Sequence, residues 1–590
     1  MAEDDQKPAS VATALPSLEE MQHWTWVIGR AQQLMMEFAG QRATNPPLFP
    51  SFPEGLAIPH ADAAKLGQVQ ADFWRDSIRL WQGFMAPGTL TPSAAATATT
   101  RPDPRFAAAE WQDNPLFALI HQTYAMVAQH LLNGVDAFET DDPRQRDRLR
   151  FVAQAALDAL SPSNFPLTNP QVLARTLETR GQNLLTGLER MLADLGRGQL
   201  TQTDSAAFEL GRNIAATPGK VIHETPLYQL IQYDPVTPQV FETPVVIFPP
   251  WINRFYILDL GPKKSFVRWA VENGLTVFMV SWRSADETMA DVTWDDYVAA
   301  QIDAVDTIRK LLGVEGVHAI GYCVSGTTLA ATLAVLEARG QAARVATATF
   351  FTAQIDFSQS GDLNLFVGDE QLKLIDTLSA QGGFLDGRFM AATFNLLRGR
   401  ELIWNYVVNN YLLGADYLPF DLLHWNSDVT NLPARWHKSY LEDLYRDNKL
   451  VSAGAVTVLG VPIDLSKVKT PSYIQAGRDD HIAPAASVWK MLDHFTGPMR
   501  FVLAGSGHIA GVVNPPDSGK YQYWTSSEPA DSLEAFIASA TETKGSWWPN
   551  WLEWLSSGSP KRVSAKKARI PGKGELPAIE DAPGRYVRTR

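Results

Sequence analysis

The chain has 590 residues, of which 45% are apolar, and a formal net charge of −13 at pH 7. This length allows more than one domain with a large core, and the negative charge argues against a protein that binds nucleic acid. One cysteine excludes a disulfide within the chain and is typical of a reducing compartment. The acidic N-terminus lacks the apolar stretch of a signal peptide, and no apolar run approaches the roughly 18 to 20 residues of a transmembrane helix, so neither is expected.

The first part of the chain predicts a helical domain over residues 17–210, after a disordered segment at 1–16. The sequence SLEE at 17–20 is a capping box that starts a helix. The apolar residues that follow recur at helical spacing. Such a stripe usually packs in a core, and the alternative is a surface that docks on a partner. Helical patterns continue on either side of a Pro/Ala/Thr-rich linker at 86–104.

The sequence pattern changes after about residue 211, where short runs of β-branched residues alternate with helical patterns. This alternation is typical of a parallel sheet wrapped by helices and predicts an α/β catalytic domain over 211–555. A helical stretch without strand signals, at about 357–433, is expected to be an insertion that forms a cap over the sheet. The basic tail at 556–590 is expected to be extended. The expected strands are 245–248, 276–281, 317–321, 345–351, 472–476 and 500–503.

Cys323, the single cysteine, lies in GYCVSG at 321–326, between an apolar strand and a helix rich in small residues. This is the pattern of a nucleophile elbow, in which a reactive side chain stands at a tight strand-to-helix turn. A thiol that attacks a thioester forms another thioester, so the acyl group keeps its transfer potential for an alcohol acceptor. A helix N-terminus and a nearby histidine would lower the pKa of such a thiol. The alternative interpretation is a small buried apolar residue, as most free cysteines are.

Two segments after expected strands offer the partners of this nucleophile. In an α/β-hydrolase fold the chain order is nucleophile, acid, histidine. Asp479 and Asp480 follow the strand at 472–476, and His508 lies in a Gly-rich loop after the next strand. Asp480 is the predicted acid because it lies closer to the Ile-Ala-Pro turn, and Asp479 is the alternative. A histidine in such a place is more often an ordinary hydrogen-bonded residue, but the chain order favours His508 as the base.

The oxyanion hole of such a site needs two backbone N–H groups. Val324, the residue after the nucleophile, is expected to supply one. The loop at 249–254 is expected to supply the other, from Trp251 or Ile252, and Ile252 is the preferred donor. The histidines show no metal-ligand spacing, so no metal site is predicted.

Several segments taken together resemble polyhydroxyalkanoate synthases, and most closely the single-subunit, short-chain kind called class I. The resemblance runs from about residue 111 to the C-terminus and implies an α/β-hydrolase core with a cap and a helical N-terminal domain. The segments are PPWINRFYILDL at 249–260, SWR at 281–283, GYCVSG at 321–326, WNYVVNNY at 404–411, WNSD at 425–428, TNLP at 430–433 and SGHIAG at 506–511.

The resemblance implies the role of each site residue. Cys323 would carry the growing acyl chain, His508 would act as general base, and Asp480 would orient that histidine or help to activate the incoming 3-hydroxyl. The family polymerises (R)-3-hydroxyacyl-CoA, here expected to be 3-hydroxybutyryl-CoA, and releases CoA, which makes the CoA thioester a substrate and requires no cofactor. Ser325 departs from the family, which usually has Gly or Ala there. With one thiol per chain, covalent chemistry is expected at one cysteine per subunit.

The resemblance also implies partners and location. Family members act as dimers at the surface of intracellular polymer granules, where granule-associated proteins are further candidate partners. Residues expected near the substrate are Trp251, Arg254, Tyr256, Arg398 and Trp425, with Lys263 and Lys264 as further basic groups near CoA. Two other functions fit parts of the pattern: a Cys-dependent hydrolase or acyl-CoA thioesterase on the same scaffold, and a scaffolding protein without catalytic activity.

Overall fold

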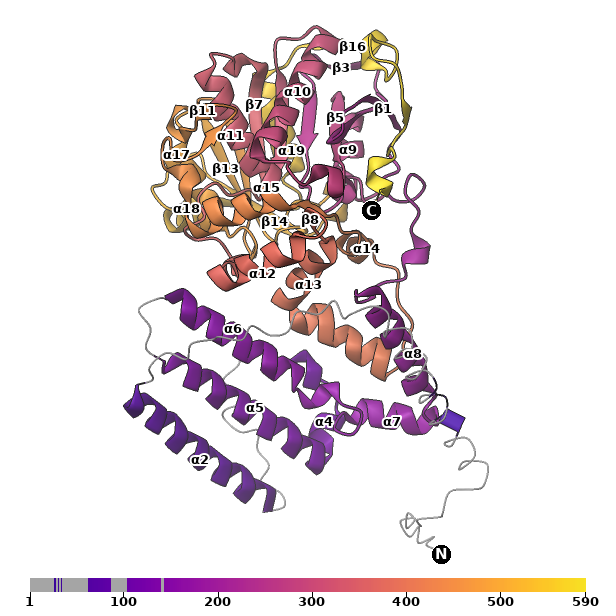
Figure 1. Ribbon diagram of the computed structural model, residues 1–590, viewed down its shortest axis with the longest axis vertical. Helices are drawn as coiled ribbons and strands as arrows, with labels where there is room; N and C mark the ends of the chain where they lie inside the picture. Colours follow the sequence, from indigo (N-terminus) through magenta and orange to yellow (C-terminus); the bar gives the residue numbers. More distant parts are fainter. Residues whose placement is uncertain are drawn as a thin grey trace, which may run out of the picture. The chain divides into compact units, whose positions relative to one another are not determined.

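The chain forms two compact units that interleave along the sequence (Figure 1). The computed structural model describes residues 26, 27, 30, 33, 62–85, 103–138 and 143–589. The helical unit consists of Met1–Thr201 and Arg398–Tyr417, and the sheet unit consists of Gln202–Leu397 and Leu418–Arg590. The segment expected to be disordered, the capping box at 17–20 and most of the linker at 86–104 lie outside the described residues.

The helical unit is built from amphipathic helices whose ends carry local signals. Its described helices include α2 (Ala63–Met85), α4 (Glu110–Asp113), α5 (Pro115–Asp136), α6 (Pro143–Ala159), α7 (Pro170–Glu178) and α8 (Gln182–Arg197). Asn114 and Asn169 cap α5 and α7 with their side chains, and a proline follows each at the first helical position. Helix α5 packs against both α2 and α6. The N-terminal region is therefore helical, as the sequence predicts.

Part of the predicted cap belongs to the helical unit. Residues 398–417 form two π-helical segments, η8 (Arg400–Trp404) and η9 (Val407–Leu412), and η9 packs on α8. The backbone of Tyr411 lies so close to Gly187 that a Cβ there would be 1.6 Å from the Tyr411 carbonyl oxygen. The Tyr411 hydroxyl donates to Asp194 over 2.6 Å. The prediction of one continuous cap over 357–433 was therefore wrong in its middle part.

An eleven-stranded sheet organises the sheet unit, in the order β15-β14-β13-β12-β7-β6-β4-β5-β2-β1-β17. The strands from β13 to β5 are parallel, and the outer ones are antiparallel. The six expected strands are found within two residues of their predicted ends, as β4 (Val245–Phe248), β5 (Val277–Trp282), β6 (Val317–Tyr322), β7 (Val345–Phe351), β12 (Ser472–Gly477) and β13 (Met499–Ala504). The others are β1 (Gly219–Glu224), β2 (Tyr228–Tyr233), β14 (Gln522–Thr525), β15 (Thr541–Lys544) and β17 (Glu580–Asp581). The predicted α/β fold is confirmed.

Helices cover both faces of this sheet, which explains why its central strands are continuous apolar runs. Side chains of α10 (Trp294–Leu312) and α11 (Val324–Ala338) belong to the hydrophobic core on one face. Side chains of α9 (Phe266–Glu272) and α19 (Trp548–Gly558) belong to the core on the other. The indole N–H groups of Trp547 and Trp548 donate to the carbonyls of Gly511 and Val512 and so hold the loop that contains His508.

The C-terminal residues pack on the sheet unit instead of forming an extended tail. Strand β17 pairs with β1 and so covers an edge that would otherwise expose unpaired backbone groups. Val587 lies in the hydrophobic core, and the Tyr586 hydroxyl donates to the Thr225 carbonyl over 2.8 Å. The tail at 556–590, which was expected to be extended, thus lies against the sheet unit and bonds to it.

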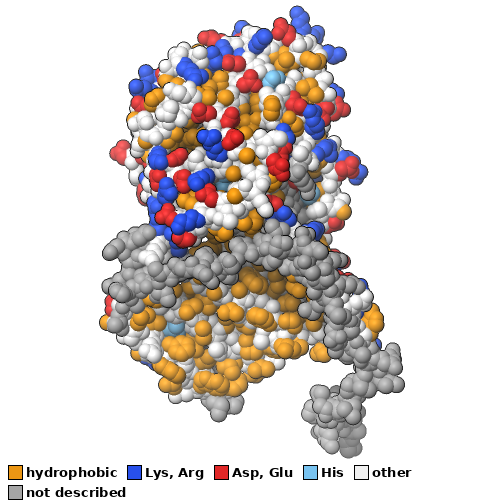
Figure 2. Space-filling model, in the orientation of Figure 1, with side chains coloured by type: hydrophobic (Ala, Val, Ile, Leu, Met, Phe, Trp, Pro, Cys, Tyr) orange, Lys and Arg blue, Asp and Glu red, His pale blue; other side chains and the backbone are white. Residues whose placement is uncertain are grey.

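Apolar side chains gather on the surface of the helical unit, whereas charged side chains of both signs are spread over the sheet unit (Figure 2). Large apolar residues exposed on α2 and α5 are Trp74, Ile78, Trp81, Leu116, Val127 and Leu131. We call these six residues the apolar patch. Exposed patches of this kind mark interaction surfaces. Among the described residues, no helix is both long enough and apolar enough to span a bilayer.

Two glycines of α8 provide a test of how residues 398–417 pack. Gly187→Ala is expected to destabilise the helical unit by about 1–3 kcal/mol, because the new methyl group overlaps the Tyr411 backbone. Gly196→Ala is the matched control, since nothing lies within 4 Å of its added Cβ and alanine favours a helix by up to about 1 kcal/mol. Thermal unfolding and limited proteolysis of residues 398–417 measure both effects. Equal behaviour of the two variants would contradict the packing described.

Candidate active site

Cys323 stands at the junction of β6 and α11 in a strained backbone conformation. Its φ is 52° and its ψ is −126°, a combination that residues with a side chain rarely adopt. The Cys323 N–H donates to the Phe351 carbonyl over 3.0 Å, and the Cys323 carbonyl accepts from Gly326 over 2.8 Å. A Cβ on Gly321 would lie 2.5 Å from the Gly326 Cα, so small residues allow the strand and the helix to meet. This is the geometry of a nucleophile elbow, and it places the sulfur at a helix N-terminus.

His508 and Asp480 form a buried pair at the same edge of the sheet. The His508 Nδ1 lies 2.7 Å from the Asp480 Oδ2. The other Asp480 oxygen accepts from the backbone N–H groups of Ile482 and Ala483 over 2.8 and 2.9 Å. Asp479 is exposed, whereas the Asp480 side chain is fully buried. Of the two candidate acids, the structure therefore brings Asp480 to the histidine.

The three side chains are electrostatically linked. Burial alone lowers the pKa of His508, but the charges of Asp480 and Cys323, and hydrogen bonds with both side chains, outweigh it and raise the pKa of His508 to about 10. The histidine therefore favours its protonated form at neutral pH when the sulfur is a thiolate. The Tyr322 hydroxyl donates to the His508 carbonyl over 3.0 Å and so holds the loop that contains His508.

Two buried tyrosines near the sulfur were missed in the sequence. Burial raises the pKa of Tyr440 and Tyr445, and the nearby charge of Cys323 raises each further. Both belong to the π-helical segment η10 (Tyr440–Arg446), and the side-chain amide of Gln354 donates to the Tyr445 hydroxyl over 3.3 Å. Residues five apart come to the same side of a π-helix but not of an α-helix. A search at ordinary helical spacing therefore could not pair them.

The loop after β4 lies beside the elbow because β4 and β6 are neighbours, with Phe248 opposite Gly321. The indole of Trp251 is buried and stacks on Tyr297 with ring centres 3.9 Å apart and an interplanar angle of 5°. Ile252 is half-buried, as is Cys323. The Trp251 side chain therefore fixes the loop to the core, whereas the Ile252 side chain is partly exposed.

Three residues predicted near the substrate are buried in contacts within the protein. Arg254 lies 3.5 Å from Asp428 and donates to the Thr589 carbonyl over 2.7 Å. The Tyr256 hydroxyl donates to Asp428 over 2.7 Å, and the indole N–H of Trp425 donates to the Arg254 carbonyl over 2.7 Å. Together with Trp251, these side chains are at most 4% exposed. Their contact with substrate stays a prediction, and in this structure each side chain is buried against other parts of the protein.

Two of the predicted basic groups, Lys264 and Arg398, have acidic partners in their own units. Lys264 binds Asp421 over 2.7 Å in the sheet unit. In the helical unit, Arg398 lies 3.5 Å from Glu401 and Arg400 binds Asp158 over 2.6 Å. Contact of Arg398 with CoA stays a prediction. Among the described residues, no three His, Cys, Asp or Glu side chains gather as metal ligands do.

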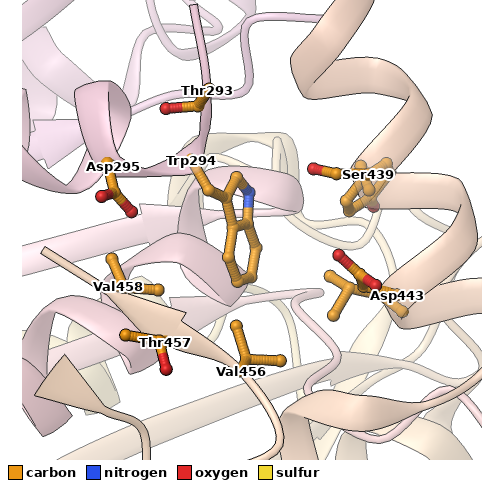
Figure 3. Close-up of a pocket in the computed structure, with 10 residues that line it drawn as sticks. Thr293, Trp294, Asp295, Ser439, Asp443, Val456, Thr457 and Val458 are labelled. Atoms are coloured by element: carbon orange, nitrogen blue, oxygen red, sulfur yellow. The ribbon is translucent and has the colours of Figure 1, made fainter. Parts of the chain in front are cut away.

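A cavity of about 160 Å³ lies in the sheet unit between the start of α10 and segment η10 (Figure 3). Trp294 projects between Ser439 and Asp443 on one side and Val456 and Val458 on the other. Tyr440 also lines this cavity, but Cys323 and the His508–Asp480 pair do not. The cavity is therefore separate from these three residues, although Tyr440 both lines it and lies near Cys323.

Comparisons with known proteins identify relatives of this chain. The family described as "Poly-beta-hydroxybutyrate polymerase (PhaC) N-terminus" matches residues 102–270, and the family described as "alpha/beta hydrolase fold" matches residues 248–515. A poly(3-hydroxyalkanoate) polymerase subunit PhaC of Rhizobium meliloti is 46% identical over 83% of this chain and 80% of its own length. A poly(3-hydroxyalkanoate) polymerase of Methylorubrum extorquens is 44% identical over 89% and 86%. The corresponding subunit of Cupriavidus necator is 42% identical over 89% of both chains.

Solved structures are less similar. The crystal structure of a monoacylglycerol lipase of Paleococcus ferrophilus is 13% identical, covers 57% of this chain and 100% of the lipase, and has a TM-score of 0.31. The sequence relatives, in contrast, extend over four-fifths or more of both chains. The chain therefore belongs to the poly(3-hydroxyalkanoate) polymerase family, an acyltransferase family, as its sequence motifs predict.

Proposed function

We propose that the chain polymerises (R)-3-hydroxyacyl-CoA, with 3-hydroxybutyryl-CoA as the expected monomer, through a Cys323-His508-Asp480 triad. The observation that carries this proposal is the strained Cys323 at a helix N-terminus with a buried His508–Asp480 pair beside it. Thioester substrates suit this nucleophile, because the acyl-enzyme keeps the reactivity that ester formation needs. The CoA thioester is a substrate, so the proposed reaction requires no cofactor.

The first step is acylation of the cysteine. His508 accepts the proton of the Cys323 thiol, and the thiolate attacks the thioester carbonyl carbon. The negative charge that develops on the carbonyl oxygen is stabilised by the backbone N–H groups of Val324 and Ile252. The carbon–sulfur bond to CoA then breaks, and the CoA thiolate takes the proton from His508.

The second step forms the ester bond. The 3-hydroxyl of an incoming monomer attacks the Cys323 thioester and gives its proton to His508, while Asp480 stabilises the imidazolium. The Cys323 thiolate leaves, and the chain, now one monomer longer and still carrying the CoA of that monomer, can acylate the same cysteine again. One thiol per chain is sufficient for this cycle.

A Cys-dependent hydrolase or acyl-CoA thioesterase is the second candidate, because it would use the same triad with water as acceptor. Family membership favours polymerisation. A scaffolding protein without activity is the third, and the intact nucleophile, base and acid argue against it.

We also propose the class I arrangement, a homodimer, action at the surface of polymer granules, and granule-associated proteins as partners. The support for the granule is the apolar patch of α2 and α5, which is suited to an apolar polyester surface.

Purified protein mixed with (R)-3-hydroxybutyryl-CoA is expected to release CoA while turbidity rises. Cys323→Ala is expected to lower both by at least about a thousand-fold, because it removes the group that carries the acyl chain. Free thiol assay and light scattering, recorded together, measure the two products. Release of CoA without turbidity would identify the hydrolase, and neither signal from the wild type would support the scaffold.

Asp480→Asn is expected to lower polymerisation by roughly a hundred- to ten-thousand-fold. Removing this negative charge lowers the pKa of His508 from its raised value of about 10, so the imidazolium that stabilises the thiolate is lost at a lower pH. Alkylation of the single cysteine should therefore become slower at pH 7, and its rise with pH should shift to more alkaline values. Asp479→Asn changes the exposed neighbour and is expected to leave the profile unchanged. If the two variants have the same profile, Asp480 is not the acid of the triad.

Replacement of Trp74 and Trp81 by serine is expected to weaken binding to isolated polyester granules by at least about ten-fold. The reason is that two large exposed apolar side chains would no longer be available for burial against the granule. Sedimentation with granules measures this binding. Gln70→Ser with Gln82→Ser is the control on the same helix. The first turnover of soluble substrate should be unchanged in both. Unaltered sedimentation of the tryptophan variant would show that the apolar patch serves another partner.

A further inference from the structure

Ser325 departs from the residue expected in its family, and its hydroxyl binds a loop outside the elbow. The side chain is fully buried in the first turn of α11. Its Oγ donates to the Pro249 carbonyl over 2.5 Å. Pro249 is the first residue after β4 and begins the loop that leads to Ile252. The hydroxyl therefore joins the elbow to this loop.

The Pro249 carbonyl is held by two donors. The indole N–H of Trp282, at the end of β5, also donates to it, over 2.8 Å. A carbonyl oxygen has two lone pairs, so the two donors together occupy both. The proline rings fix the φ angles of Pro249 and Pro250. Once the Pro249 carbonyl is held in place, few backbone torsions between it and the Ile252 N–H can still rotate.

The elbow end of this link is also fixed. The Ser325 carbonyl accepts from the side-chain amide of Gln301 over 3.1 Å, and the Gln301 oxygen accepts from the Thr332 hydroxyl over 2.7 Å. All three residues are fully buried. Farther along the loop, the stack of Trp251 on Tyr297 prevents rotation just before Ile252. Both ends of the connection are thus rigid, and the hydroxyl of Ser325 joins them.

We propose that Ser325 is a positioning residue that fixes the separation of the two oxyanion donors, the N–H groups of Val324 and Ile252. The inference rests on the proposed function, in which these groups stabilise the charge that develops on the attacked carbonyl. That charge is largest in the transition state, so the hydroxyl acts on kcat more than on KM. Acylation, ester formation and hydrolysis share the same oxyanion, so all three are slowed together.

The test compares Ser325→Ala with Ser472→Ala, a buried serine on β12 whose hydroxyl donates to the Thr470 carbonyl over 2.9 Å. Each variant loses one buried hydroxyl that binds a backbone carbonyl. Ser325→Ala is expected to lower kcat for CoA release by roughly ten-fold, because a shift of the donors weakens transition-state binding. KM, the alkylation rate of Cys323 and the ratio of polymer to free hydroxy acid should stay within two-fold of the wild type. Ser325→Thr keeps the hydroxyl and should restore most of kcat.

Three results would overturn the inference. One is a kcat of Ser325→Ala within two-fold of the wild type, and another is an equal loss in Ser472→Ala. The third is a changed ratio of polymer to hydroxy acid, which would mean that Ser325 controls water near the thioester instead of the oxyanion donors. A wild-type enzyme that releases no CoA would contradict the proposed function and the inference with it, whereas the other outcomes leave the proposed function intact.

Discussion

The backbone of Cys323 is the constraint on which the site depends. A positive φ at a residue with a side chain costs of order 1–3 kcal/mol, and it persists because surrounding groups hold it. The hydrogen bond to the Phe351 carbonyl holds Cys323 to the neighbouring strand. The close approach of Gly321 and Gly326 fixes the direction in which the helix leaves the strand. In return, the side chain of Cys323 stands at the N-terminus of α11, directly after the end of β6.

Two kinds of neighbouring group surround the charged side chains of the site: backbone N–H groups at Asp480 and neutral tyrosine hydroxyls near Cys323. Two backbone N–H groups donate to one oxygen of Asp480, and its other oxygen faces His508. The orientation of the Asp480 side chain is therefore fixed by groups other than the histidine. The hydroxyls of Tyr440 and Tyr445 stay neutral because burial and the cysteine raise their pKa. They therefore offer polar groups near the sulfur without adding a second negative charge.

The sequence predicts what local pattern and chain order determine. Central strands covered on both faces must be apolar runs, which is why β4 to β13 were found, and the order of Cys323, Asp480 and His508 follows from the fold. Three features depend on long-range packing and could not be predicted: the return of residues 398–417 to α8, the pairing of β17 with β1, and the π-helical turn that aligns two tyrosines. Each arises from a partner far away in the sequence or from one extra residue in a turn.

Several of the motif residues support the loop at 249–254 by hydrogen bonds. Thr430 donates to the Trp251 carbonyl, Trp425 donates to the Arg254 carbonyl, and the Arg254 side chain reaches the C-terminal residues. Ser325 holds the start of the same loop. Because an oxyanion donor must lie about 2.7–3.1 Å from the oxygen that it stabilises, a loop without regular secondary structure needs such anchors on several sides. Under the proposed function, side chains far from the sulfur limit where the Ile252 N–H group can point.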